Sequence, residues 1–111
     1  MRILKINADF TDLNFPLLPK HMKITNNTDH QRFEVEIDGD YAFIEYRWHE
    51  GVIYLMHTFV PDSLRGRGLA QQLTQFALDT IRQEKWPLKV YCPFVTKYIQ
   101  QHPQYQELLS T

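Results

Sequence analysis

A short segment near the middle of the chain has the residue types that bind phosphate. It reads Arg65-Gly66-Arg67-Gly68 and comes directly before a stretch with helical periodicity. The first N–H groups of a helix have no partner within the helix, and the helix dipole favours an anion beside them. Glycines allow a phosphate oxygen to approach those N–H groups, and arginines add positive charge. The alternative is a glycine-rich turn with two solvated arginines.

Three other side chains could take part in catalysis. His57 interrupts an apolar stretch, so it is either a hydrogen-bonded core histidine or a general base. Cys92 comes directly before Pro93. A helix that begins there would favour the thiolate, whereas burial would leave Cys92 a small apolar residue. Glu45 is a weaker candidate base, because alternation alone does not fix the face on which it lies.

The elements that position these residues begin with strands. Residues 33–37 alternate apolar and charged side chains, and Asp38-Gly39-Asp40 has the Asp-Gly signal of a tight hairpin. A second alternating run, 41–48, ends at a turn over 49–51. Residues 52–60 are apolar on both faces, which predicts a central strand. We therefore expect a meander of three antiparallel strands.

Helical periodicity follows the central strand. It predicts a helix from about Gly66 to about Lys85. A short strand over 88–92 should then pair in parallel with the central strand and complete a right-handed βαβ unit. Pro93 suits the first turn of a helix to about Gln101, and a last short helix covers residues 104–109. The predicted fold class is α+β with a mixed sheet.

Composition excludes several classes of protein. With 111 residues, 43% of them hydrophobic, the chain suits one compact domain. Its formal net charge of −1 gives no general attraction to nucleic acid or to an anionic membrane, and no apolar run approaches the ~20 residues of a membrane span. A single cysteine excludes an intramolecular disulfide, and the histidines lack the spacing of metal ligands. We expect a cytoplasmic protein without a metal.

The first 21 residues differ in pattern from the rest. They include Pro16 and Pro19 and show no clean periodicity, whereas a regular pattern begins near Met22. We therefore divide the chain into an N-terminal extension, residues 1–21, and a domain, residues 22–111. The extension is either a strand and loop that pack on the domain, or a dispensable appendage ahead of a working start at Met22.

The motifs resemble those of the GNAT superfamily of acetyl-CoA-dependent N-acetyltransferases. Arg65-x-x-Gly68-x-Ala70 matches its Q/R-x-x-G-x-G/A signature and follows a strand that ends in Val60-Pro61. The chain is also similar to a family of very short GNAT-like proteins, the "N-acetyltransferase domain-containing" proteins. The motifs that carry this likeness are His57-Thr58-x-Val60-Pro61, Arg65-Gly66-Arg67-Gly68-Leu69-Ala70, Cys92-Pro93-Phe94-Val95, Tyr98-Ile99 and His102-Pro103-x-Tyr105. They fall in order between about residues 31 and 109.

This resemblance implies a reduced GNAT fold that binds acetyl-CoA. The pyrophosphate of the cofactor would lie on Arg65, Gly66, Arg67, Gly68, Leu69 and Ala70. Backbone groups near His57, among them those of Thr58, Phe59 and Val60, would bind the pantetheine arm. Tyr98 resembles the GNAT tyrosine that protonates the departing CoA thiolate, and its alternative is an aromatic side chain packed on the sheet edge. The implied partners are acetyl-CoA and an unidentified amine or protein acceptor.

Two routes for acetyl transfer stay open. In the direct route His57 takes a proton from the amine, backbone N–H groups of the central strand stabilise the oxyanion, and Tyr98 protonates the leaving thiolate. In the covalent route Cys92, activated by His57 opposite it, accepts the acetyl group first. The chain lacks the helical pair that follows the first strand of full-length GNAT enzymes, and its connection from Pro61 to Arg65 is one residue longer than in many members of the superfamily. A non-catalytic acetyl-CoA sensor is therefore the alternative function.

Overall fold

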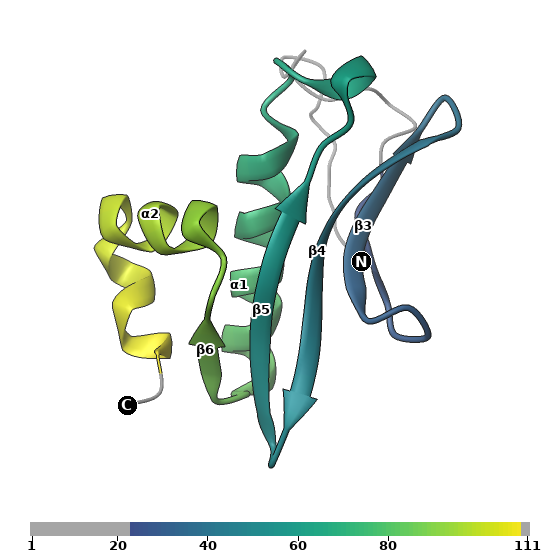
Figure 1. The fold of residues 1–111 in the computed structure, drawn as a ribbon. Helices are drawn as coiled ribbons and strands as arrows, with labels where there is room; N and C mark the ends of the chain where they lie inside the picture. Colours follow the sequence, from purple (N-terminus) through teal and green to yellow (C-terminus); the bar gives the residue numbers. More distant parts are fainter. Residues whose placement is uncertain (1–22, 110–111) are drawn as a thin grey trace, which may run out of the picture.

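The computed structural model describes residues 23–109, which form a mixed sheet with its helices on one face (Figure 1). Five strands lie in the order β2-β3-β4-β5-β6. Their bounds are Thr25–Asn27 for β2, Arg32–Ile37 for β3, Asp40–His49 for β4, Val52–Phe59 for β5 and Leu88–Val90 for β6. Strands β2 to β5 are antiparallel, and β6 pairs in parallel with β5. The predicted extension over residues 1–21 lies outside the described residues.

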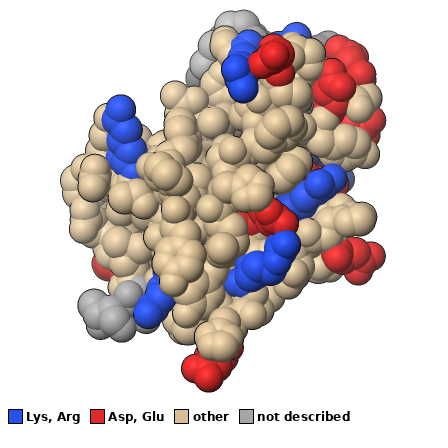
Figure 2. Space-filling view, in the orientation of Figure 1, with Lys and Arg blue, Asp and Glu red and all other residues tan. Residues whose placement is uncertain are grey.

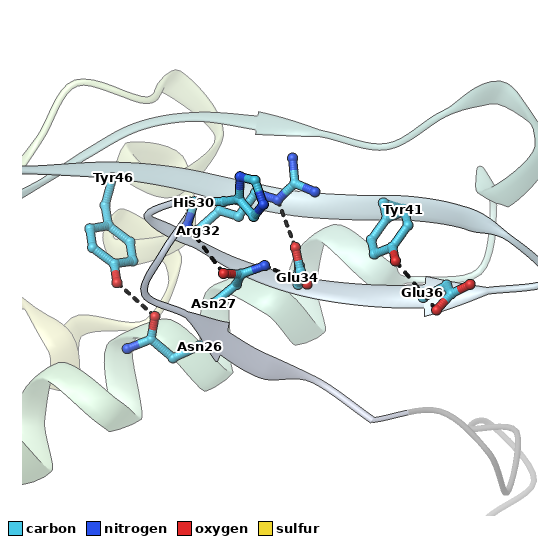
Figure 3. Close-up of polar contacts among 8 residues, drawn as sticks. All are labelled: Asn26, Asn27, His30, Arg32, Glu34, Glu36, Tyr41 and Tyr46. Atoms are coloured by element: carbon cyan, nitrogen blue, oxygen red, sulfur yellow. Dashed lines mark hydrogen bonds and ion pairs between the residues drawn. The ribbon is translucent and has the colours of Figure 1, made fainter.

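The predicted antiparallel meander is confirmed, and it has one strand more than expected. Asp38 and Gly39 have φ angles of 54° and 87°, the left-handed conformation that an Asp-Gly hairpin turn uses. The additional strand, β2, is polar and too short to give a periodic signal. Side chains hold it in place (Figure 3): the Tyr46 hydroxyl donates to Asn26 Oδ1 at 2.7 Å, and Asn27 Nδ2 donates to Glu34 Oε2 at 3.0 Å.

The helices confirm the predicted crossover, with shifted ends. They are η1 (Asp62–Leu64), α1 (Leu69–Glu84), α2 (Pro93–Gln101) and η2 (Pro103–Leu108). Helix α1 begins at Leu69 rather than Gly66, because Gly66 and Gly68 have φ angles of 82° and 72°, which no right-handed helix contains. Strand β6 ends at Val90 rather than Cys92, and the last helix is a 3₁₀ helix. No helix between residues 23 and 109 has the length and apolarity needed to cross a membrane.

The core lies between the helices and the inner face of the sheet. One stripe of α1 is buried: Leu69, Leu73, Thr74, Ala77, Leu78 and Ile81. The inner face of the sheet supplies Phe33, Val35, Ile37, Ala42, Ile44, Tyr46, Ile53, Leu55 and Leu88. Strand β5 lies between β4 and β6, as its apolar residues predicted. Its other side, the outer face, stays partly open to solvent: Tyr54 is half-buried and Phe59 is 46% exposed.

The packing of η2 on α1 gives a testable dependence of stability on pH. The buried Tyr105 hydroxyl donates to Asp79 Oδ1 at 2.7 Å, and burial together with this bond raises the pKa of Tyr105 to about 12. Since the pKa is ~10 in an unfolded chain, the folded state keeps the proton more tightly. This stabilisation is full below pH ~10 and is lost as the pH rises toward the folded pKa. Urea titrations should show the free energy of unfolding falling across this window.

The variant Tyr105→Phe isolates the contribution of this hydroxyl. We expect it to lower the free energy of unfolding at neutral pH by about 1 kcal/mol and to flatten its fall above pH ~10. Equal slopes for wild type and variant would contradict the assignment.

Candidate active site

Strands β5 and β6 separate at the end of the sheet where the predicted site residues lie. Their pairing covers Ile53–Leu55 and Leu88–Val90. The N–H groups of Tyr91 and Cys92 then both donate to the Leu55 carbonyl, at 2.9 and 3.2 Å, and the chain turns into α2. Strand β5 continues to Phe59 without a partner on this side within residues 23–109. The edge of β5 beyond Leu55 is therefore open.

A β-bulge interrupts β5 at the same place. Tyr46 pairs with Leu55, but the next residue back along β4, Glu45, pairs with His57. Met56 is therefore an extra residue with no partner. In a regular strand His57 would share the inner face with Leu55, two residues earlier. The bulge reverses this, and His57 lies on the outer face.

The bulge also determines where the backbone of Thr58 points. The Tyr46 N–H donates to the Gln31 carbonyl at 2.9 Å, on the β3 side of β4. Ile44, two residues earlier in β4, has the same orientation, and it pairs with Thr58. The N–H and carbonyl of Thr58 are therefore directed away from β4 and toward the open edge. Neither group has a backbone partner among residues 23–109, so a ligand at this edge meets one donor and one acceptor.

His57 and Thr58 place their side chains on opposite faces of the sheet. Thr58 Oγ1 lies 3.2 Å from the sulfur of Cys92, which is only 2% exposed on the inner face. The His57 side chain is 57% exposed on the outer face, with Nε2 3.2 Å from Glu45 Oε1. The two side chains therefore do not face each other, as the covalent route, in which His57 activates Cys92, would require. The physical reason is the extra residue in β5, which gives no signal in the sequence.

The predicted phosphate loop lies at the start of α1. Gly68 is the N-cap residue, and no side chain caps the helix. A Cβ on Gly68 would meet only ordinary contacts at 3.9 Å, so the left-handed backbone rather than lack of space favours glycine there. The first helical hydrogen bond runs from the Gln72 N–H to the Gly68 carbonyl. The N–H groups of residues 69–71 come before it and have no partner within the helix.

The two arginines of the loop differ in their contacts. Arg65 donates from Nε to the Val60 carbonyl at 3.3 Å, and its Nη1 lies 3.0 Å from Asp62 Oδ1. These bonds tie the loop to the end of β5, although the ion pair is well exposed and therefore weak. Arg67 is exposed and makes no side-chain hydrogen bond or ion pair with residues 23–109. The guanidinium charge of Arg67 is therefore more available to a bound anion than that of Arg65.

A groove of about 500 Å³ lies between the first turn of α1 and helix α2. It is lined by Gln71, Phe94, Lys97, Tyr98, Gln101 and His102. Tyr98 is 8% exposed and stacks on His102, with 4.0 Å between ring centroids. Burial, and then the charge of Asp79, raise the pKa of Tyr98, so its hydroxyl keeps its proton at neutral pH. His102 is thus half-buried against Tyr98.

Comparison with known proteins identifies the family. Residues 32–108 match the family described as GCN5-related N-acetyl-transferase. The chain belongs to this family. Protein NATD1 of Mus musculus and that of Homo sapiens are each 32% identical to this GCN5-related chain in an alignment of 94 residues that covers 80% of it and 86% and 83% of the two relatives. Protein NATD1 of Danio rerio is 26% identical in an alignment of 105 residues that covers 90% of this chain and 96% of its own.

A solved structure supports the fold of this GCN5-related chain. The NMR solution structure of a GCN5-like protein from Staphylococcus aureus has a TM-score of 0.64 and 22% sequence identity, and covers 83% of this chain and 91% of its own. The predicted α+β class and the resemblance to the GNAT superfamily are therefore confirmed. The roles of His57, Cys92, Tyr98 and the loop over 65–70 stay predictions. Between residues 23 and 109, no three His, Cys, Asp or Glu side chains form a metal-binding group.

Several features of the GCN5-related site were not predicted. Gln71 and Phe94 line the groove, the Thr58 hydroxyl meets the Cys92 thiol, and Glu45 contacts His57. Helical phase could have found Gln71, because it stands in the first turn after the loop. The contact of Glu45 with His57 depends on the bulge, and no residue type in β5 predicts a bulge.

Proposed function

We propose that this protein binds acetyl-CoA at the open edge of β5 and transfers the acetyl group to an amine. GCN5-related N-acetyltransferases use acetyl-CoA as cosubstrate. The observation that carries the proposal is two sets of backbone groups without partners among residues 23–109. One is the N–H and carbonyl of Thr58 at the open edge of β5, and the other is the N–H groups of residues 69–71 at the start of α1.

The residues present fit the cofactor. The amides of a pantetheine arm can pair with the Thr58 N–H and carbonyl as an added strand would, beside Phe59 and Val60. The pyrophosphate would be held by the N–H groups of residues 69–71 and by the charge of Arg67. Gln72 Oε1, in the same helical turn, is buried without a hydrogen-bond partner among residues 23–109. This oxygen can only accept a hydrogen bond, so a donor of the ligand such as an amide N–H, and not the pyrophosphate, would satisfy it.

We propose the direct route for the reaction. The amine nitrogen attacks the thioester carbonyl, a C–N bond forms, the C–S bond breaks, and His57 takes the proton of the amine. A backbone N–H of β5 would stabilise the oxyanion. Tyr98, whose raised pKa keeps it protonated, would return a proton to the thiolate. The covalent route is less well supported, because Cys92 is buried and lies on the face opposite His57.

Two measurements test this function. Calorimetry with acetyl-CoA should give saturable binding, and release of CoA thiol with a panel of polyamines, lysine peptides and small primary amines should reveal the acceptor class. Intact mass after mixing with acetyl-CoA should show no acetyl adduct, and Cys92→Ala should keep wild-type turnover within about threefold, because it removes no group of the direct route.

Each of the other outcomes would favour an alternative to direct acetyl transfer or contradict the proposal. An adduct that disappears in Cys92→Ala together with turnover would establish the covalent route. Saturable binding without thiol release for any amine would favour an acetyl-CoA sensor. Absence of binding would contradict the proposal as a whole.

A further inference from the structure

We infer that Glu45 is a positioning residue that holds the His57 imidazole with its proton on Nε2. Nδ1 is then the atom that receives the proton of the acceptor amine, and it does so on the outer face of the sheet. The inference rests on the proposed function, in which His57 is the general base, and adds to it a second residue, a tautomer and a direction of approach.

The contact itself determines which imidazole nitrogen carries the proton. His57 Nε2 lies 3.2 Å from Glu45 Oε1. An ionised carboxylate can only accept hydrogen bonds, so Nε2 must be the donor in this pair. In the neutral ring the other nitrogen, Nδ1, then has a free lone pair. A base needs such a lone pair, and Glu45 therefore selects the tautomer in which Nδ1 is the base.

Glu45 is itself fixed on its second oxygen. Arg47 Nη2 lies 2.5 Å from Glu45 Oε2, and Arg47 Nη1 donates to the Tyr46 carbonyl at 2.7 Å. The Glu45 side chain is 25% exposed, less than half the exposed fraction of His57. A carboxylate held from both sides restricts the ring that it contacts. This is the usual arrangement by which an outer hydrogen bond orients a working histidine.

The surroundings of the Glu45–His57 pair leave one direction from which an amine can reach Nδ1. The Phe43 ring lies 6.3 Å from the imidazole, and Phe59 lies 5.4 Å from Phe43, between ring centroids. Within residues 23–109, both α helices lie on the inner face (Figure 1). Figure 2, in the same orientation, shows mostly uncharged surface over β5, with acidic groups gathered over the β3–β4 hairpin. An amine that reaches Nδ1 therefore arrives across the outer face, away from Cys92.

The proton transfer balances without a further reactant. As the amine nitrogen bonds to the thioester carbon, its proton passes to Nδ1 and the ring becomes an imidazolium. Nε2 keeps its proton and its bond to Glu45, whose negative charge stabilises the cation. The electron pair of the breaking C–S bond leaves with sulfur. Glu45 thus orients and stabilises the imidazole but never takes the proton.

The first test measures the imidazole in the free protein. Nitrogen-15 NMR of the full chain, under conditions in which the imidazole is neutral, should show only the Nε2–H tautomer for His57. In Glu45→Leu, both tautomers should be populated. Glu36→Leu, an exposed carboxylate in β3 of the same sheet, is the matched control and should leave the spectrum of His57 unchanged. An Nδ1–H ring in the wild type, or identical spectra in Glu45→Leu, would overturn the inference.

The second test measures turnover. Glu45→Leu should lower kcat by about 10- to 100-fold, with the KM for acetyl-CoA nearly unchanged. Glu45→Gln, whose amide oxygen still accepts from Nε2, should keep more activity than Glu45→Leu. In a His57→Gln background the Glu45→Leu change should cost nothing further, and an equal additional loss there would overturn the inference. If the wild type shows no turnover, the proposed function fails, while the NMR test still decides whether Glu45 sets the tautomer.

Discussion

Replacing His57 by glutamine is expected to lower kcat for acetyl transfer by about 10²- to 10⁴-fold, the usual contribution of a general base. The affinity for acetyl-CoA should change little. The His57 side chain lies on the outer face, whereas the groups proposed to bind the cofactor are the backbone of Thr58 and the start of α1. Thiol release under saturating acetyl-CoA gives kcat, and calorimetry gives the affinity.

His49→Gln is the matched control for this variant. His49 is an exposed histidine at the end of β4. Among residues 23–109 its one ion pair is with the exposed Glu50, and its ring centroid lies 6.3 Å from that of Tyr54. The His49→Gln variant should leave both kcat and the affinity for acetyl-CoA unchanged. If His57→Gln kept kcat within about threefold of wild type, His57 would not be the base, and Glu45 would become the next candidate on this face.

The second large effect is expected at the start of α1, where stability and binding should change in opposite directions. Gln71→Glu places a carboxylate in the first turn of α1, beside the unpaired N–H groups. The helix dipole favours that charge by about 0.3–1 kcal/mol, so the variant should melt at a slightly higher temperature. The same charge repels a bound pyrophosphate. At partly screened distances of about 5 Å the repulsion is worth a 10- to 100-fold loss of acetyl-CoA affinity.

Gln75→Glu separates this local effect from a general change of net charge. Gln75 is an exposed glutamine one turn further along the same helix. The Gln75→Glu variant should bind acetyl-CoA nearly as well as wild type, as measured by calorimetry at low and high salt. Equal losses for the two variants would show that the loop is not the pyrophosphate site. A loss that shrinks as salt increases is expected for Gln71→Glu alone.

Most of the fold could be predicted because its elements have strong periods. The alternation in residues 33–37 and 41–48 and the helical spacing after residue 68 each bury one face, and the structure confirms them. Strand β2 could not be predicted, since Thr25–Asn27 has no apolar period and is held by side-chain bonds to residues of β3 and β4. The late start of α1 follows from two left-handed glycines, whose conformation the residue type allows but does not require.

The order of the candidate site residues along the chain could be predicted, but the face of the sheet on which each side chain lies could not. His57 lies on β5 beyond the point where β5 and β6 separate, Cys92 lies just before α2 and Tyr98 within it, and the loop over 65–70 leads into α1. The face on which His57 lies depends on one extra residue in β5, and that residue, Met56, is apolar like Leu55 before it and has no type that marks a bulge. A period-2 pattern therefore assigns His57 to the wrong face.

The bulge at Met56 links the register of one strand to the choice between two chemistries. In the observed register the imidazole meets Glu45 outside, and the hydroxyl of Thr58 meets the thiol of Cys92 inside. If residues 56–59 paired with β4 without the bulge, every side chain in that segment would change face. His57 would then turn toward Cys92, and Thr58 would turn toward solvent. A register shift of one residue would therefore move His57 from the position proposed for a general base to one beside Cys92. The register of β5 relative to β4 thus decides which of the two proposed reactions the side chains could support.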